Sequence, residues 1–320
     1  MEVNYILPNF FCLGRNEILI NIYKKRRNIM RDNIRIYSFY GTFPKATWNG
    51  GRVDNREQKV SKKYMKRIRD FYNKNGIVIT FTFTNILLTE EHLKDEYCNE
   101  ILKVFHNGKN EVLVASELLE NYIKQNYPKY KINRSITANH DEEYNYDKYN
   151  MVVIDKKYNR DYEYLKIIKK KEKVELLCDE VCFNDCKFTK QHYKEISDLQ
   201  LGAMPKHELY GRCRYQDRLP SCKYIQDRNK NSKYYISPND VSNIYAMMGF
   251  KYFKLSGREK YNFIGLESII DYLIKPEYQM DVRTYIMERI LLEAEEDINK
   301  QLAIEKEYSM QIDNRGYKYV

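Results

Sequence analysis

Residues 56–83, REQKVSKKYMKRIRDFYNKNGIVITFTF, hold the pattern that decides the fold. Apolar side chains recur at helical spacing in the first part, which predicts an amphipathic helix over residues 56–75. Gly76 follows at the position where helices commonly end. Residues 77–83 are rich in β-branched and aromatic side chains, which is typical of a buried strand. A helix followed directly by such a strand is the repeating unit of a parallel sheet.

The same alternation extends in both directions along the chain. The predicted strands are residues 34–39, 77–83, 111–115, 131–137, 149–155, 174–177, 233–236 and 250–255. Helical patterns follow most of them, including residues 118–127 and 161–170. Eight strands with intervening helices predict a (β/α)8 TIM-like barrel, with a doubly wound open sheet as the alternative. Residues 282–307 continue in a helical pattern and predict an extra C-terminal helix.

The length of 320 residues suits one barrel with an appendage, since such barrels typically need about 250 residues. Apolar residues make up 43% of the chain and are spread along it, so a sizeable core is available. We therefore expect a barrel over residues 1–280 that carries a cysteine-bearing insertion at about 178–230. Residues 281–320 are expected to form a helical extension that packs on the barrel.

The sequence favours a cytoplasmic location without membrane insertion. No stretch approaches the about 18 uninterrupted apolar residues of a membrane span. The first residues lack the basic and apolar regions of a signal peptide. Seven cysteines, an odd number unevenly placed, do not suit a secreted disulfide framework and favour a reducing compartment.

The formal net charge of +10 is concentrated in two basic runs. One contains Lys24, Lys25, Arg26, Arg27 and Arg31, and the other contains Lys59, Lys62, Lys63, Lys66, Arg67 and Arg69. Such faces can hold the phosphates of RNA or bind a protein partner. Solvated helix faces without a partner are the alternative interpretation.

Functional groups of a barrel lie where its strands end and in the loops that follow. This rule selects Arg52, Asn85, Arg134 and Arg258 as candidate substrate-binding residues. The stretch Trp48-Asn-Gly-Gly-Arg52 either brings its backbone close to a ligand or forms a tight loop around a packed tryptophan. His140 beside Asp141 is an acid–base candidate or an ordinary surface histidine. No catalytic residue is assigned.

The cysteines give the most specific signal. Cys178 ends a predicted strand, and Cys182 and Cys186 follow at intervals of four. Thiolates bind iron–sulfur clusters or zinc, and four of them close a site. We expect metal ligation by Cys178, Cys182, Cys186 and Cys222, with Cys213 as the alternative fourth ligand. The spacing lacks the two close pairs of a zinc ribbon, so zinc is the second choice, and buried apolar cysteines are the interpretation without a metal.

Residues 175–186, ELLCDEVCFNDC, together with QHY at 191–193, YISPND at 235–240 and FKLSGR at 253–258, resemble the peptidase U32 family. The resemblance covers about residues 30–260 and rests mainly on 174–260. It implies a barrel with a cysteine set in its second half, a 4Fe–4S cluster, and oxygen-independent hydroxylation of an RNA base or a quinone precursor. Cys182 and Cys186 match best, although the cysteines are more tightly spaced than in familiar members.

Three functional hypotheses follow. The first is a U32-like iron–sulfur protein that supports oxygen-independent hydroxylation or other modification of a nucleobase in RNA. The second is a U32-type peptidase or hydrolase, which the sequence supports weakly because it shows no Ser–His–Asp arrangement and no HExxH motif. The third is a non-catalytic barrel in which a metal staples a long loop and the basic surface binds a partner.

Overall fold

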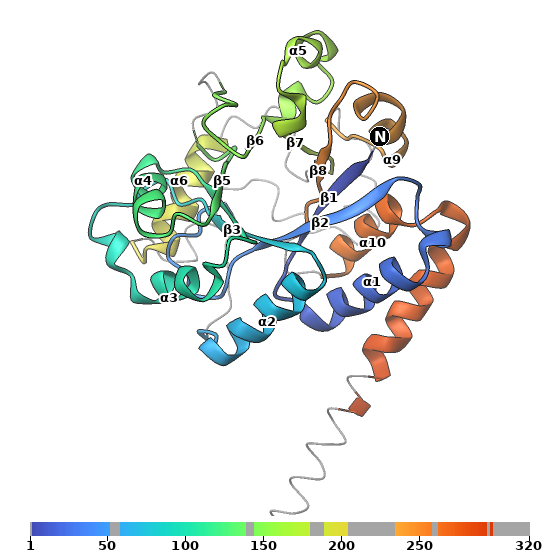
Figure 1. Ribbon diagram of the computed structural model, residues 1–320, viewed down its shortest axis with the longest axis horizontal. Coiled ribbons are helices and arrows are strands. Elements are labelled where there is room, and N and C mark those ends of the chain that lie inside the picture. Colours follow the sequence, from blue (N-terminus) through green and yellow to red (C-terminus); the bar gives the residue numbers. More distant parts are fainter. Residues whose placement is uncertain are drawn as a thin grey trace, which may run out of the picture. The chain divides into compact units, whose positions relative to one another are not determined.

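The structure is a closed, eight-stranded parallel barrel with surrounding helices (Figure 1). This computed structural model describes residues 2–51, 58–138, 144–179, 189–203, 234–257, 262–292 and 295–296. The strands pair in sequence order, and β8 closes the barrel against β1. The predicted (β/α)8 TIM-like barrel is confirmed, and the predicted extra C-terminal helix is present over residues 279–292 of the described chain.

The strands are short, and nearly every residue in them is buried. They are β1 (Val3–Pro8), β2 (Ile34–Gly41), β3 (Val78–Phe83), β4 (Glu111–Val114), β5 (Lys131–Arg134), β6 (Met151–Val153), β7 (Val174–Leu177) and β8 (Tyr252–Lys254). The labelled α-helices among the described residues are α1 (Leu13–Lys25), α2 (Lys62–Lys74), α3 (Glu96–Phe105), α4 (Glu117–Asn126), α5 (Tyr162–Ile167), α6 (Thr189–Gln200), α9 (Pro238–Asp240) and α10 (Asn262–Leu273), and the C-terminal helix over residues 279–292 follows them.

The helices that follow β2, β3 and β4 begin with side-chain caps. Ser61, Asp95 and Ser116 each accept a hydrogen bond from a backbone N–H of the first turn, in α2, α3 and α4 respectively. The cap at Ser61 starts α2 later than the predicted residue 56, because a capped helix begins at its cap. The predicted helix 118–127 corresponds closely to α4.

The first strand of the barrel was not predicted. β1 is buried along its whole length and pairs with both β2 and β8, so it closes the barrel. Asn4 and Pro8 interrupt its apolar pattern. The predicted strand 34–39 is therefore the second strand of the barrel.

The predicted strand at residues 233–236 is wrong. Residues 234–236 belong to no strand, and their backbone groups are hydrogen-bonded by groups outside the sheet. Tyr234 and Tyr235 carbonyls accept from the Asn159 and Arg160 side chains, so they are not free to pair with a neighbouring strand. One missed strand and one false strand leave the total at eight. The long inserted segment consequently lies between β7 and β8.

A β-bulge in β2 turns a tyrosine into the barrel. Tyr5 pairs with Ile36 and Ile6 with Ser38, so Tyr37 is the extra residue that has no partner in β1. A bulge re-aims a side chain, because it breaks the alternation of the strand. Phe39 faces outward onto Tyr72 of α2, with ring centroids 5.2 Å apart, whereas the Tyr37 hydroxyl donates a hydrogen bond to Glu111.

The chain divides into two units. One contains Met1–Phe11 and Arg31–Leu273, and therefore holds all eight strands. The other contains Cys12–Met30 and Ile274–Val320, with α1 and the described part of the C-terminal helix, and an antiparallel bridge pairs Met30 with Ile274 within it. The boundary expected at residue 280 stays a prediction.

Candidate functional site

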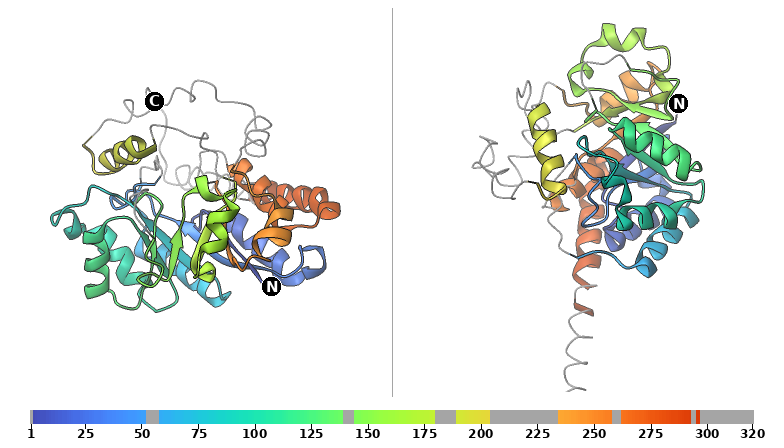
Figure 2. Two further views of the ribbon diagram at one scale, coloured as in Figure 1. Left: turned by 90° about the horizontal axis from the view of Figure 1, so that it is seen from above. Right: turned by 90° about the vertical axis from the view of Figure 1, so that its left-hand side faces the viewer.

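Asn85 follows β3 at the carboxyl end of the barrel and binds its surroundings through both ends of its amide. The Nδ2 group donates to the carbonyls of Thr47 and Ser197, at 3.1 Å each, and Oδ1 accepts from Leu87 N–H at 2.9 Å. Ser197 belongs to α6, which lies at the carboxyl ends of the strands (Figure 2). Asn85 therefore joins the loop after β2 to α6, and its expected contact with a substrate stays a prediction.

Arg134 ends β5 and is half-buried. Its Nη1 group donates to the Ala115 carbonyl at 2.8 Å, and its guanidinium lies 5.8 Å from the centre of the Tyr149 ring. Asn133, the preceding residue, points into the barrel, so alternation places Arg134 on the outer side of the strand. Arg134 thus stabilises the junction of β4 and β5, and its role toward a substrate stays a prediction.

The loop at Trp48 is tightly packed against the end of β3. The Trp48 side chain is fully buried, and its Nε1–H donates to the His92 carbonyl at 2.8 Å. A Cβ on Gly50 would lie 2.5 Å from both Asn85 Cα and the Thr84 carbonyl oxygen. Gly50 is therefore required because backbone approaches backbone, which supports the second interpretation of this stretch, a tight loop around a packed tryptophan.

Cys178 comes directly after β7, as predicted, but its thiol is enclosed. Its side chain is fully buried, within electrostatic range of the hydroxyls of Tyr5, Tyr235 and Tyr272. Burial, followed by the neighbouring Asp179 carboxylate, holds the pKa of the thiol well above its ordinary value. Leu177, the preceding residue, packs with Leu113 and Val153 inside the barrel, so alternation turns Cys178 outward.

The two ends of the segment between β7 and β8 meet at one point. The Ile236 N–H donates to the Cys178 carbonyl at 2.9 Å. Asn159 is fully buried and donates through Nδ2 to the carbonyls of Leu177 at 2.7 Å and Tyr234 at 2.8 Å. One amide thus binds the chain at both ends of this segment, where it leaves β7 and where it returns toward β8. The Asn159 Oδ1 atom is buried without a hydrogen-bond partner within the described residues.

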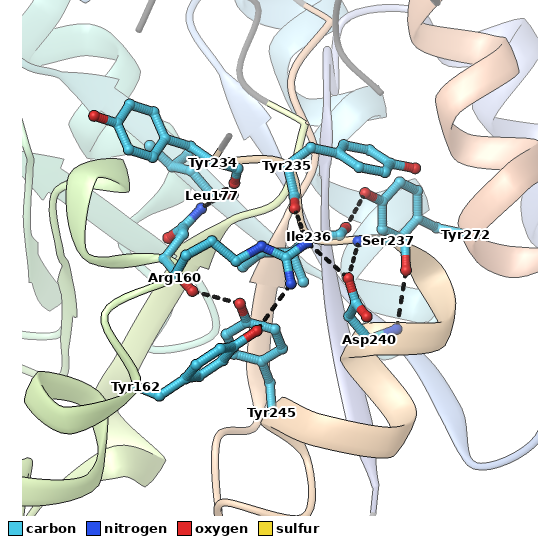
Figure 3. A network of polar contacts seen from close by, with 11 residues as sticks. Arg160, Tyr162, Leu177, Tyr234, Tyr235, Ile236, Ser237, Asp240, Tyr245 and Tyr272 are labelled. Atoms are coloured by element: carbon cyan, nitrogen blue, oxygen red, sulfur yellow. Dashed lines mark hydrogen bonds and ion pairs between the residues drawn. The ribbon is translucent and has the colours of Figure 1, made fainter. Parts of the chain in front are cut away.

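Arg160 binds residues 235–240, where the chain returns toward β8 (Figure 3). Its guanidinium donates to the Tyr235 carbonyl, to the Tyr162 hydroxyl at 3.0 Å and to Asp240 Oδ2 at 2.8 Å. Asp240 also forms a reciprocal capping box with Ser237 at the start of α9. Burial alone would raise the pKa of Asp240, but the hydrogen bonds from Arg160 and Ser237 outweigh it and lower that pKa.

Asp179 ties the end of β7 to the end of β8. Its Oδ1 atom accepts from the Ser256 N–H at 2.6 Å, and its Oδ2 atom accepts from the Ser268 hydroxyl. The Ser256 hydroxyl donates in turn to the Asp179 carbonyl at 2.8 Å. The carboxylate therefore acts as a cross-link between strand ends and α10, beside the start of the cysteine run.

The interior of the barrel contains a polar cluster around Glu111. Its carboxyl accepts from Tyr37, from Asn133 Nδ2 at 2.9 Å and from Asn150 Nδ2 at 3.3 Å. Glu111 is 1% exposed, and burial raises the pKa of its carboxyl despite these hydrogen bonds. A carboxyl in such an environment favours the protonated form.

A buried ion pair lies in the same interior. Lys254 Nζ donates to Glu175 Oε1 at 2.7 Å, and the two side chains are 7% and 1% exposed. The ammonium also lies 4.3 Å from the centre of the Tyr40 ring. Tyr40 donates its hydroxyl to the Leu255 carbonyl at 2.8 Å. The pair and the ring form a charge site that is sealed from solvent.

Several predicted site residues lie outside the described residues. They are Arg52, Arg258, Cys182, Cys186, Cys222, the alternative ligand Cys213, and the His140–Asp141 pair. Within the described residues no group of three or more His, Cys, Asp or Glu side chains is placed to hold a metal ion. The cysteine ligand set therefore stays a prediction.

Sequence reasoning missed the interior cluster and the Asn159–Arg160 contacts. Glu111, Glu175 and Lys254 lie within the predicted strands, and a charged residue within an apolar strand of a parallel barrel is itself a signal for a polar interior. Asn159 and Arg160 follow a short strand in a polar stretch, and nothing in the sequence distinguishes them from a surface loop.

Comparison with known proteins gives one likeness to report. No protein-family model matches the sequence, and no curated protein matches it. The chain is similar to a solved structure described as the structure of the U32 peptidase Mk0906, with a TM-score of 0.47 and 14% sequence identity over 81% of this chain and 94% of that one. The family that the sequence resembles is thus also the family of this solved structure.

Within the described residues, every helix is too short or too polar to span a lipid bilayer.

Proposed function

We propose that this chain is an iron–sulfur protein that modifies a nucleobase in RNA at the carboxyl end of its barrel. The observation that carries the proposal is the position at which β7 ends. The strand stops at Leu177, so the run Cys178, Cys182 and Cys186 begins where barrel enzymes place their chemistry.

The described surroundings of Cys178 favour a different fourth ligand. The Cys178 side chain is fully buried, and alternation after Leu177 turns it outward, away from the barrel interior. We therefore infer that Cys182, Cys186 and Cys222 bind the metal and that Cys213 is the fourth ligand, with Cys178 as a buried thiol at the base of the segment. A 4Fe–4S cluster bound there supplies one-electron chemistry.

RNA is proposed as the substrate class because of charge. The net charge is +10, and exposed cations lie along α2. Phosphate backbones bind such surfaces in a salt-dependent manner. For the peptidase alternative, the printed contacts of two described histidines offer no direct support: His92 Nδ1 accepts from the Thr89 N–H and lies 3.0 Å from the Thr89 hydroxyl, and His106 Nε2 accepts from the Lys129 N–H.

The test is anaerobic purification followed by iron and acid-labile sulfide analysis and a visible spectrum. We expect about four irons per chain and a broad absorption band. Cys182→Ala, Cys186→Ala, Cys213→Ala and Cys222→Ala should lose the iron, whereas Cys178→Ala should retain it. Cys12→Ala serves as the matched control, because Cys12 lies far from this segment in sequence.

The outcomes separate the hypotheses. Iron that is lost in Cys178→Ala and kept in Cys213→Ala would restore Cys178 as the ligand. If the wild-type protein contains zinc and no iron, the redox proposal is refuted, and a structural metal site in a long loop of a non-catalytic barrel is supported instead. RNA from cells with and without the protein should then differ by one modified nucleoside in mass spectrometry, and an unchanged nucleoside profile in the iron-loaded case would contradict the modification.

A further inference from the structure

Helix α2 exposes a row of four cations, of which one, Lys62, forms an ion pair with a described residue. Lys62, Lys63, Lys66 and Arg67 are exposed to solvent, and we call them the α2 basic row. The opposite face of the helix is buried through Met65, Ile68 and Tyr72, and it anchors α2 to the barrel. The row is therefore presented on a helix that is itself held firmly.

The position of these cations is unfavourable for the helix. Lys62 and Lys63 occupy the first turn, where the positive end of the helix dipole repels cations. The first turns of α3, α4 and α5 instead carry acidic residues, whereas that of α2 has none.

Like charges also repeat at a spacing of four residues. Lys62 precedes Lys66 by four residues, and Lys63 precedes Arg67 by four, and like charges at this spacing destabilise a helix. Helix stability therefore does not account for the row.

Little acidic charge neutralises the row. Asp70, the one acidic residue within α2, is bonded by Arg69 at 2.8 Å, and Lys62 pairs with Glu100 of α3 at 3.5 Å. Among the residues that the structure describes, no carboxylate forms an ion pair with Lys63, Lys66 or Arg67. Unneutralised cations on neighbouring turns suit an extended polyanion, whose charges are repeated along its length.

The row does not suit a membrane surface. Interfacial helices insert large apolar side chains beside their cations. The large apolar side chains exposed within the described residues are Ile167, Met247, Met280, Tyr285, Leu291 and Leu292, and none of them belongs to α2.

The row lies on the side of the barrel where the proposed chemistry occurs. Since β2 is parallel to all other strands, the chain leaves it at the carboxyl end of the barrel before it enters α2. The first turns of α2 thus lie toward that end, outside β2 and β3 (Figure 1). A strand held there leads toward the barrel mouth.

We propose that the α2 basic row binds the phosphate backbone of a single-stranded RNA and delivers a base of that strand to the barrel mouth. The proposal deepens the RNA-modifying function and rests on it for the identity of the polyanion. The recognition is electrostatic, so the row sets affinity and orientation, while base selection belongs to the mouth.

The test is fluorescence anisotropy with a labelled single-stranded RNA at several salt concentrations. For a single strand, each phosphate contact contributes about 0.7 to the slope of log affinity against log salt concentration. The triple variant Lys63→Ala, Lys66→Ala, Arg67→Ala removes three such contacts and should therefore reduce this slope by about 2. Affinity at low salt should fall at least about tenfold. The matched control, Lys157→Ala, Lys166→Ala, Lys169→Ala, removes three positive charges elsewhere. It should change the slope by less than the value of about 0.7 that one phosphate contact contributes.

An equal loss in the two triple variants would overturn the proposal, because attraction by net charge alone would then explain binding. Equal binding of the wild type and the α2 variant would also overturn it. If the α2 variant loses binding to anionic lipid vesicles but keeps RNA binding, the row serves a membrane instead. Thermal unfolding provides the folding control, since removal of unfavourable like charges should leave the stability of the α2 variant equal or higher.

Iron analysis separates this proposal from the proposed function. Iron-loaded wild-type protein that does not bind RNA would refute the role of the row and leave the cluster in place. If the protein contains no iron but its RNA binding depends on the α2 basic row, the iron–sulfur cluster is refuted and the role of the row is supported. The α2 variant should contain as much iron as the wild type.

Discussion

The backbone N–H of Ile236 donates a hydrogen bond of 2.9 Å to the carbonyl of Cys178, although a long inserted segment separates the two residues in the sequence. Asn159, in the segment that follows β6, reinforces this junction, because its side chain donates to the carbonyls of Leu177 and Tyr234 on either side. The entry and the exit of the cysteine-bearing segment are thus fixed at the same point of the barrel.

Replacement of Asn159 should loosen that junction. Asn159→Ala removes the side-chain donor from two buried carbonyls, so we expect a loss of about 2–3 kcal/mol in the free energy of unfolding. Urea denaturation measures the change, and hydrogen exchange at the Ile236 amide should accelerate at the same time. Asn126→Ala is the control, because Asn126 is exposed and bonds one carbonyl of its own helix. Equal effects in both variants would contradict the role of Asn159.

Glu111 should make stability depend on pH. Burial raises the pKa of its carboxyl in the folded protein above the ordinary value of 4.5. The contribution of Glu111 to the free energy of unfolding is therefore fully present at pH values below its unfolded-state pKa, and it is lost as the pH rises through its folded-state pKa. Glu111→Gln keeps an acceptor for Tyr37 but does not ionise, so the variant should lack this decline. The urea midpoints of the wild type and of Glu111→Gln, measured at a series of pH values, check this prediction. If the midpoints of the two proteins change with pH in the same way, the prediction is refuted.

The Lys254–Glu175 pair should behave as a coupled unit. Lys254→Met leaves the Glu175 carboxylate buried and unpaired, which should cost about 3–5 kcal/mol. The double variant Lys254→Met, Glu175→Gln removes both charges, and we expect it to recover most of that loss. Chemical denaturation of the single and double variants gives the coupling energy. Additive losses would show that the ion pair does not act as a unit.

Gly50 should tolerate no side chain. A Cβ at this position would lie 2.5 Å from two backbone atoms, so Gly50→Ala must displace the loop from β3, at a cost of about 1–3 kcal/mol. Gly76→Ala is the comparison, because its φ of 71° is strained for alanine but no atom lies within 4 Å of the added Cβ. Thermal unfolding of both variants, with tryptophan fluorescence for Trp48, measures the effect. An altered Trp48 environment is expected in Gly50→Ala alone.

The sequence predicted the barrel because helix and strand periods alternate clearly over most of the chain. It missed β1, where Asn4 and Pro8 interrupt the pattern, and it mistook residues 233–236 for a strand. Both errors concern short apolar runs, for which local pattern does not distinguish a strand from an irregular buried segment.

The polar interior could be predicted only in part. Glu111 and Glu175 are visible as charges within apolar strands, but the bulge that brings Tyr37 to Glu111 depends on the register between β1 and β2. Such a register is a property of strand pairing and leaves no signal in the local sequence. The burial of Cys178 likewise depends on tertiary packing, and the tyrosines within electrostatic range of its thiol, namely Tyr5, Tyr235 and Tyr272, are distant in sequence.

The junction between Cys178 and Ile236 makes the segment that it closes an exchangeable cassette. Since its two ends are pinned together by the barrel, the segment can lengthen, shorten or change composition without altering the positions of β7 and β8. The entropic cost of closing a longer loop grows only slowly with its length. The residues of this cassette can therefore change in evolution while the barrel that holds its two ends stays the same.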